Sequence, residues 1–180
     1  PLSNEMRTVF NKRLQMLTTL HAIRMLFRAL GLITTLTTLS AMVIQQLRGE
    51  PFGKLDTPTN TREKLSREQI APAILLYRAI RPKLGDEEAK RITQDIVIDA
   101  TQLFLSRVMG NLPEALALPA PHREQWVHER GEQFFNAAIT WTKISDNGVD
   151  FTVTACAFPR LCRSAGVPEL APIFCEGDLH

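Results

Sequence analysis

The sequence predicts an α+β domain in which several helices precede a small antiparallel sheet. Apolar residues recur at helical spacing through most of the chain before residue 139. The pattern then changes to alternation on both sides of Asn147-Gly148, and Asn-Gly between two such segments is a strong hairpin signal. We therefore expect a hairpin over residues 139–155 that ends at Cys156. Its buried face is expected to carry alternate residues of the second strand, namely Val149, Phe151, Val153 and Ala155.

Length and composition indicate one ordinary globular domain. The chain has 180 residues, of which 44% are apolar and 22% charged, and it can bury a sizeable core without a disulfide or metal. Three cysteines are too few, and too odd a number, for the disulfide framework of a secreted protein. We expect a cytoplasmic protein, with membrane association through its N-terminal part as a further expectation.

The first 48 residues predict a basic amphipathic helical arm. They carry six Lys/Arg residues and one acid, Glu5. An apolar stripe at helical spacing is expected to be buried by other helices or by a second copy of the chain, and it consists of Met16, Leu20, Ile23, Phe27 and Leu30. A solvated helix face also explains the charges. Contact with a membrane surface or a partner helix through residues 6–48 is the sharper alternative.

The stretch 29–47 contains 19 residues without a charge, near the length that spans a bilayer. Seven of them are Thr, Ser or Gln, which favours an interfacial or partner-facing helix over a true transmembrane span. We expect no cleavable signal peptide, because the apolar run starts late and no small-residue cleavage pattern follows it. Few aromatic residues lie among the bases and no nucleic-acid reader motif is present, so we expect no nucleic-acid partner.

Glycine and proline residues divide the remainder of the chain into segments. Residues 49–65 are interpreted as a polar linker, and residues 66–180 as the main domain. The Ser66 and Gln69 pair has the spacing of a capping box, so a helix is predicted from 66 to about Pro82. A central packing helix is predicted over 86–109, and a further helix from about residue 122.

The chemistry-bearing residues gather at the C-terminus. Cys156, Cys162 and Cys175 lie within the last 25 residues, and Asp178 and His180 follow them. Their spacing matches no zinc ribbon or thioredoxin motif. The residues alone are consistent with three roles for these cysteines: buried structural thiols, metal ligands or a nucleophile. The sequence contains no nucleophile-elbow, phosphate-loop or dinucleotide glycine motif.

Three C-terminal segments resemble one known family. They are Phe-Thr-Val-Thr-Ala-Cys-Ala-Phe at 151–158, Gly-Val-Pro-Glu-Leu at 166–170 and Phe-Cys-Glu-Gly-Asp at 174–178. Together they resemble the L-2-amino-thiazoline-4-carboxylic acid hydrolase family. Tyr-Arg-Ala-Ile at 77–80 and Leu-Gly-Asp-Glu-Glu-Ala at 84–89 are similar to the helical part of that family. The resemblance covers roughly residues 70–180.

The resemblance implies hydrolytic opening of a small cyclic amidine at a C–N bond. The residues that match the family pattern are Cys156, Cys175 and Asp178, and Cys162 falls outside it. One reading has a thiolate of Cys156 or Cys175 attack the amidine carbon while Asp178 holds or accepts a proton. The other has Zn²⁺ bound by Cys156 and Cys175 with Asp178 or His180, which activates a water.

Further expectations concern the segment between Cys156 and Cys175 and the class of protein. The sulfurs of Cys156 and Cys175 are expected on one side of the domain, above packed Phe158 and Phe174. The family pattern continues with further strands after Asp178, so we expect a domain that lacks them. The rival to the hydrolase is a non-catalytic small-molecule-binding or sensor module, with the basic arm docking a membrane or a partner protein.

Overall fold

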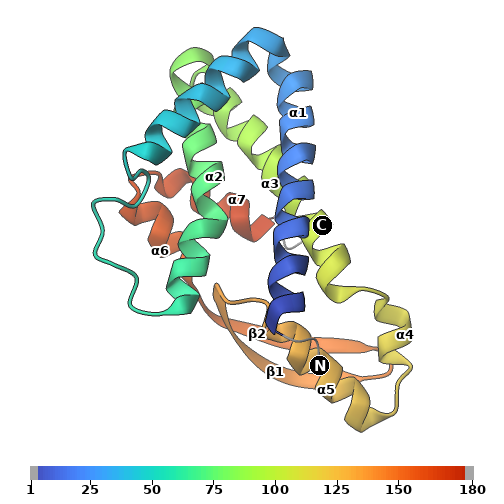
Figure 1. Ribbon diagram of the computed structural model, residues 1–180. Coiled ribbons are helices and arrows are strands. Elements are labelled where there is room, and N and C mark those ends of the chain that lie inside the picture. Colours follow the sequence, from blue (N-terminus) through green and yellow to red (C-terminus); the bar gives the residue numbers. More distant parts are fainter. Residues whose placement is uncertain (1–3, 177–180) are drawn as a thin grey trace.

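The computed structural model describes residues 4–176, and the side chains of residues 19–175 (Figure 1). This part of the chain holds seven α-helices and a two-stranded antiparallel sheet, so the α+β expectation is confirmed. The elements in order are α1 Asn4–Leu47, α2 Thr61–Leu84, α3 Asp86–Met109, α4 Leu112–Leu116, α5 Ala120–Gly131, β1 Ala137–Ser145, β2 Gly148–Cys156, α6 Ala157–Ser164, the 3-10 turn η1 Pro168–Leu170, and α7 Ala171–Glu176.

Helix α2 begins five residues earlier than predicted. The Asn60 side chain accepts a hydrogen bond from the Glu63 backbone N–H at 2.9 Å, and Glu63 reaches back to the Thr59 N–H at 3.2 Å. This reciprocal pairing satisfies amides of the first turn and fixes the start of the helix. The hydroxyl of Ser66, the predicted cap, instead donates to the Arg62 carbonyl within the helix. The linker is correspondingly shorter than the predicted 49–65.

Helices α2 and α3 form an antiparallel pair around the main core. Helix α3 has the predicted bounds, whereas α2 continues past Pro82 and ends at Leu84 before Gly85. Helix α3 packs against α1, α2 and α7, as expected of a central packing helix, and most apolar side chains of α2 are also buried. The core also takes side chains from α6, η1 and α7, including Leu161, Leu170 and Ile173.

Helix α1 is bent at Gly31, where φ is 73° and ψ is 173°. This backbone conformation is open only to glycine, so the residue divides α1 into two helical halves. The first half runs beside α3, and the second half crosses the end of the α2–α3 pair (Figure 1). The Lys83 ammonium at the end of α2 donates to the Thr37 hydroxyl at 2.8 Å, which fixes that crossing.

Two members of the N-terminal stripe are not buried by other helices of this chain, and burial of the stripe by a second copy of the chain stays a prediction. Leu20 is 57% exposed and Phe27 is 36% exposed, while the Met16 side chain lies outside the described residues. The core contact of this half is made instead by Leu26, with Ala22, Met25 and Leu30 partly buried beside it. The buried line is therefore rotated by about one residue from the predicted stripe, because spacing alone cannot distinguish neighbouring apolar faces of one helix.

The hairpin at Asn147-Gly148 is confirmed, with Cys156 as the last residue of β2. The predicted buried face of β2 is wrong, because Phe151 and Val153 are each about half exposed. Helix α5 packs against β1. Gly131 of α5 allows this contact: a Cβ there would stand 2.3 Å from the Trp141 ring, too close for any other residue without movement.

Candidate functional site

The site begins where the hairpin returns to the helices. Cys156 is half-buried at the end of β2 and is also the N-cap of α6. Asn136 holds this junction on both sides: its side-chain amide donates to Cys156 Sγ at 3.8 Å, and its carbonyl accepts from the Ala157 N–H at 2.8 Å. The strand end and the helix start therefore meet at one cysteine, with an amide donor directed at its sulfur.

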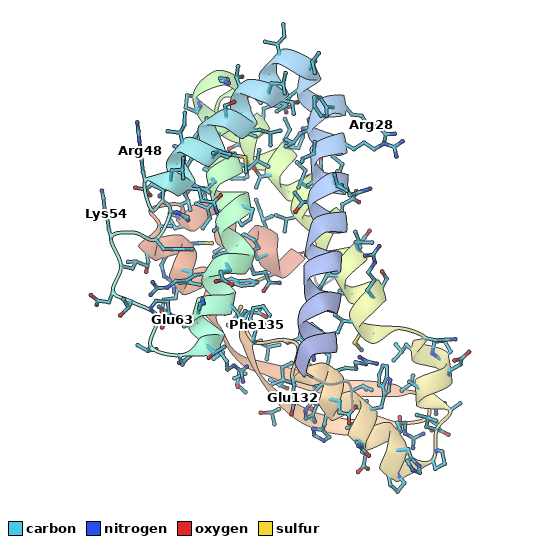
Figure 2. The ribbon with its side chains drawn as sticks, viewed as in Figure 1. Arg28, Arg48, Lys54, Glu63, Glu132 and Phe135 are labelled. Carbon is cyan, nitrogen blue, oxygen red and sulfur yellow. The ribbon has the colours of Figure 1, made fainter. Side chains whose placement is uncertain are left out.

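A guanidinium at the start of α2 holds the segment that precedes β1. Arg62 donates to the backbone carbonyls of Phe134, Phe135 and Ala137, at 3.3, 3.1 and 2.6 Å. Figure 2 shows Phe135 beside the end of α2 that carries Glu63. Because Ala137 is paired with Cys156 in the sheet, these hydrogen bonds also position the cysteine.

Cys162 lies between the two other cysteines and is fully buried in α6. Burial raises the pKa of its thiol to about 11, and negative charge at Cys156, Glu169 and Cys175 acts in the same direction. Cys156 and Cys175 therefore lie close enough to Cys162 for a charge on either sulfur to affect the pKa of its thiol. A thiol with this pKa is protonated at neutral pH and is a poor nucleophile.

Cys175 is exposed on α7, which packs against α6 and α3. The predicted support beneath this part of the chain is confirmed: the rings of Phe158 and Phe174 lie 5.3 Å apart between centroids. The excursion from Cys156 therefore returns toward its start. Asp178 and His180, the remaining predicted site residues, lie outside the described residues.

The described residues contain no group of three His, Cys, Asp or Glu side chains arranged to hold a metal ion. The zinc site predicted on Cys156 and Cys175 needs Asp178 or His180, which the structure does not describe. Two clefts lie elsewhere on the molecule. One, of about 340 Å³, lies between Glu50, Lys54, Arg78 and the end of α6, and the other, of about 470 Å³, lies between α1 and α3.

A buried tyrosine network adjoins the cysteines, and the sequence interpretation missed it. The hydroxyl of Tyr77, which is fully buried in α2, lies 2.7 Å from Asp86 Oδ1 and 2.9 Å from Glu169 Oε1. It carries one hydrogen and so donates to one carboxylate at a time. Arg81 bridges the same two carboxylates, at 2.5 Å and 3.5 Å. The network ties α2, α3 and η1 together.

The sequence did contain a signal for this network. Tyr77, Asp86 and Glu169 each lie in a segment that carries the family resemblance, but in three different segments. Burial, followed by the hydrogen bonds to the two carboxylates, raises the pKa of Tyr77 well above its usual value. The hydroxyl is therefore a permanent donor at neutral pH. We infer that it positions η1, and with it the chain between Cys162 and Cys175.

Comparison with protein families matches residues 63–179 to the family described as L-2-amino-thiazoline-4-carboxylic acid hydrolase. This match covers more than half of the chain. The protein belongs to this family. The matched region begins in the first turn of α2 and includes the tyrosine network and all three cysteines, whereas α1 lies outside it. No curated protein and no solved structure matches the chain significantly.

Proposed function

We propose that this family member hydrolyses a C–N bond of a small cyclic amidine of the 2-amino-thiazoline-4-carboxylate type, with Cys156 as the nucleophile. The family match supports the reaction class. The observation that carries the choice of residue is the position of Cys156 at the strand end and helix N-cap, with the Asn136 amide directed at Sγ. A helix N-terminus and an amide donor both stabilise negative charge on sulfur.

The chemistry requires one thiolate and one proton. The Cys156 thiolate adds to the amidine carbon, and the bond from that carbon to the ring nitrogen breaks as the nitrogen takes up a proton. Water then attacks the same carbon and displaces the Cys156 sulfur as a thiolate. The net reaction adds one water across the bond between the amidine carbon and the ring nitrogen. Cys175 and Asp178 are proposed to hold or move the proton, and the role of Asp178 rests on the family pattern alone.

Cys162 has a different role in this proposal. Its thiol is buried and has a raised pKa, so it supports the packing between α6 and the core and takes no part in bond making. The Tyr77 network is proposed to act through position, because its hydroxyl contacts two carboxylates and no described cleft includes it. Tyr77 and Glu169 are therefore positioning residues.

A second candidate is a non-catalytic binding or sensor module. It is favoured by one observation: the two clefts described above are not lined by any cysteine. The cleft between α1 and α3 is lined by His21, Arg24, Arg28 and Arg91, with Asp99 as its one acid, and it suits a small anionic ligand. In that case the ligand binds without being opened, and substitution of Cys156 leaves its affinity unchanged.

Ring opening of 2-amino-thiazoline-4-carboxylate by the purified chain tests the proposal. Cys156→Ala should lower kcat/KM by at least about a thousandfold, as loss of a nucleophile does. Cys162→Ala is the matched control and should retain kcat within about tenfold once the folded fraction is measured. Equal losses from the two variants would contradict the assigned roles. Stoichiometric zinc that disappears in Cys156→Ala would replace the thiolate mechanism with the metal-activated water.

A further inference from the structure

The second half of α1, residues 32–47, is apolar on its outer face. Large apolar side chains on this face are exposed, and Ile33 and Leu47 reach 78% and 83% exposure. The full set is Leu32, Ile33, Leu36, Val43, Ile44 and Leu47, and we call it the outer apolar face. They form two groups, 32–36 and 43–47, that lie seven residues apart and therefore on the same side of the helix, with exposed Ser40 between them.

The inner face of the same segment is more polar than the outer face. Thr35 and Thr38 are completely buried against the α2–α3 pair, and neither hydroxyl has a hydrogen-bond partner among the described residues. Leu39 and Met42 are partly buried beside them. A surface helix in water normally has the opposite arrangement, with apolar residues inside and polar residues outside. The reversal indicates that the outer face meets an apolar medium.

Positive charge flanks the outer apolar face at both ends. Arg28, which also lines the cleft between α1 and α3, precedes it, and Arg48 and Lys54 follow it; Figure 2 shows the ends of all three side chains directed toward solvent. None of them has an ion-pair partner among the described residues, and residues 6–49 contain no acid. The acids at the start of α3 are already paired, Asp86 with Arg81, Glu87 with Lys90 and Glu88 with Arg91.

The stretch Thr19–Leu47 is long and apolar enough to cross a membrane by length and composition, and only 11% of its most apolar window is buried. The bend at Gly31 prevents the two halves from forming one straight rod. Residues 32–47 alone extend about 24 Å, less than the roughly 30 Å hydrocarbon core. Their inner face is also occupied by α2. In this fold the segment can lie on a membrane but not span it.

We propose that the outer apolar face docks on the surface of an anionic lipid bilayer, with its six apolar side chains inserted below the headgroups and Arg28, Arg48 and Lys54 among the lipid phosphates. An interfacial helix combines apolar insertion with electrostatic attraction in this way. The inference does not rest on the proposed function, because the match to the family begins after α1.

Co-sedimentation of the full chain with lipid vesicles tests the docking surface. The wild type should bind vesicles containing about a third phosphatidylserine more tightly than pure phosphatidylcholine vesicles. The triple variant Leu32→Gln, Ile33→Gln, Leu36→Gln should lose about a thousandfold in affinity for both, since each inserted side chain contributes about tenfold. Leu118→Gln, an exposed leucine distant from α1 in the chain, is the matched control and should bind as the wild type does.

The charges are tested separately. Arg48→Gln with Lys54→Gln should weaken binding to the anionic vesicles by about fivefold per charge and leave binding to phosphatidylcholine unchanged. Absence of vesicle binding by the wild type would overturn the proposal, as would an equal loss in Leu118→Gln. A wild-type dimer in light scattering that the triple variant converts to a monomer, without vesicle binding, would assign the face to a second copy of the chain. Urea unfolding should show that all of these exposed-residue variants fold.

Discussion

Helix α2 and the second half of α1 place equally apolar side chains in opposite environments. Ile74 of α2 is fully buried in the main core, whereas Ile33 of α1 is 78% exposed. The family match includes the first region and excludes the second. The difference separates two uses of apolar residues within one chain: α2 builds the fold that carries the cysteines, and the outer face of α1 is available to another phase or molecule.

The largest expected effect is on the buried side of this comparison. Ile74→Ala should lower the free energy of unfolding by about 2–5 kcal/mol, because it removes buried methyl groups and leaves a cavity. Ile33→Ala is the same substitution at an exposed site and should change that free energy by less than about 0.5 kcal/mol. Urea titrations monitored by circular dichroism measure both. Similar losses in the two variants would mean that the second half of α1 is an integral part of the core.

The next effect concerns the tyrosine network that holds α2 to η1. Tyr77→Phe should cost about 1–3 kcal/mol at neutral pH, because the half-buried Glu169 carboxylate and the exposed Asp86 carboxylate lose their shared donor. The raised pKa of Tyr77 means that the folded state retains the proton when the unfolded chain releases it. Its stabilising contribution is therefore complete below about pH 10 and falls as the pH rises above that value. Unfolding measured from pH 7 to 11 should show this fall in the wild type and a shallower one in Tyr77→Phe.

An effect of similar size is expected at the buried cysteine. Cys162→Ser should destabilise the fold by about 1–3 kcal/mol, because a hydroxyl replaces an apolar thiol inside the core. Cys175→Ser, on exposed α7, is the control and should alter stability little. Alkylation of the wild type with iodoacetamide, followed by mass spectrometry, should modify Cys162 last. Rapid labelling of Cys162 in the native protein would contradict both its burial and its raised pKa.

The smallest effect lies at the start of α2. Hydrogen bonds from Arg67, and then from Thr59, hold the pKa of Glu63 down to about 2. The stability that this carboxylate contributes is present above its ordinary pKa of about 4.5 and is lost as the pH falls toward 2. Glu63→Gln should therefore flatten the acid limb of the stability profile between those values. An unchanged acid limb would show that the hydrogen bonds of Glu63 with Arg67 and Thr59 do not persist in solution.

Local signals predicted much of the fold. The bounds of α3, the hairpin at Asn147-Gly148 and the contact between Phe158 and Phe174 all follow from residues near one another in sequence. The predicted start of α2 was wrong because Asn60 and Glu63 form the capping hydrogen bonds that were predicted for Ser66 and Gln69. The predicted burial of one face of β2 was wrong. Alternation shows that a strand has two different faces, but it does not show which face another element covers.

The candidate site was predictable only in part. The position of Cys156 follows from the hairpin, and the fold brings Cys162 and Cys175 into the same region. The Tyr77 network was not predictable from spacing, because Glu169 lies 92 residues away from Tyr77 and the contact depends on how η1 packs. The roles assigned to Cys156, Cys175, Asp178 and His180 stay predictions.

The bend in α1 has a consequence for how such chains diverge. Its direction depends on one residue, Gly31, and a Cβ there would meet no atom within 4 Å, so only backbone strain opposes replacement. Every glycine codon becomes an alanine, valine or acidic codon through one base change. Relatives can therefore straighten or redirect the arm in one mutational step while leaving the cysteine region untouched. The proposed docking surface can in this way evolve independently of the cysteine region.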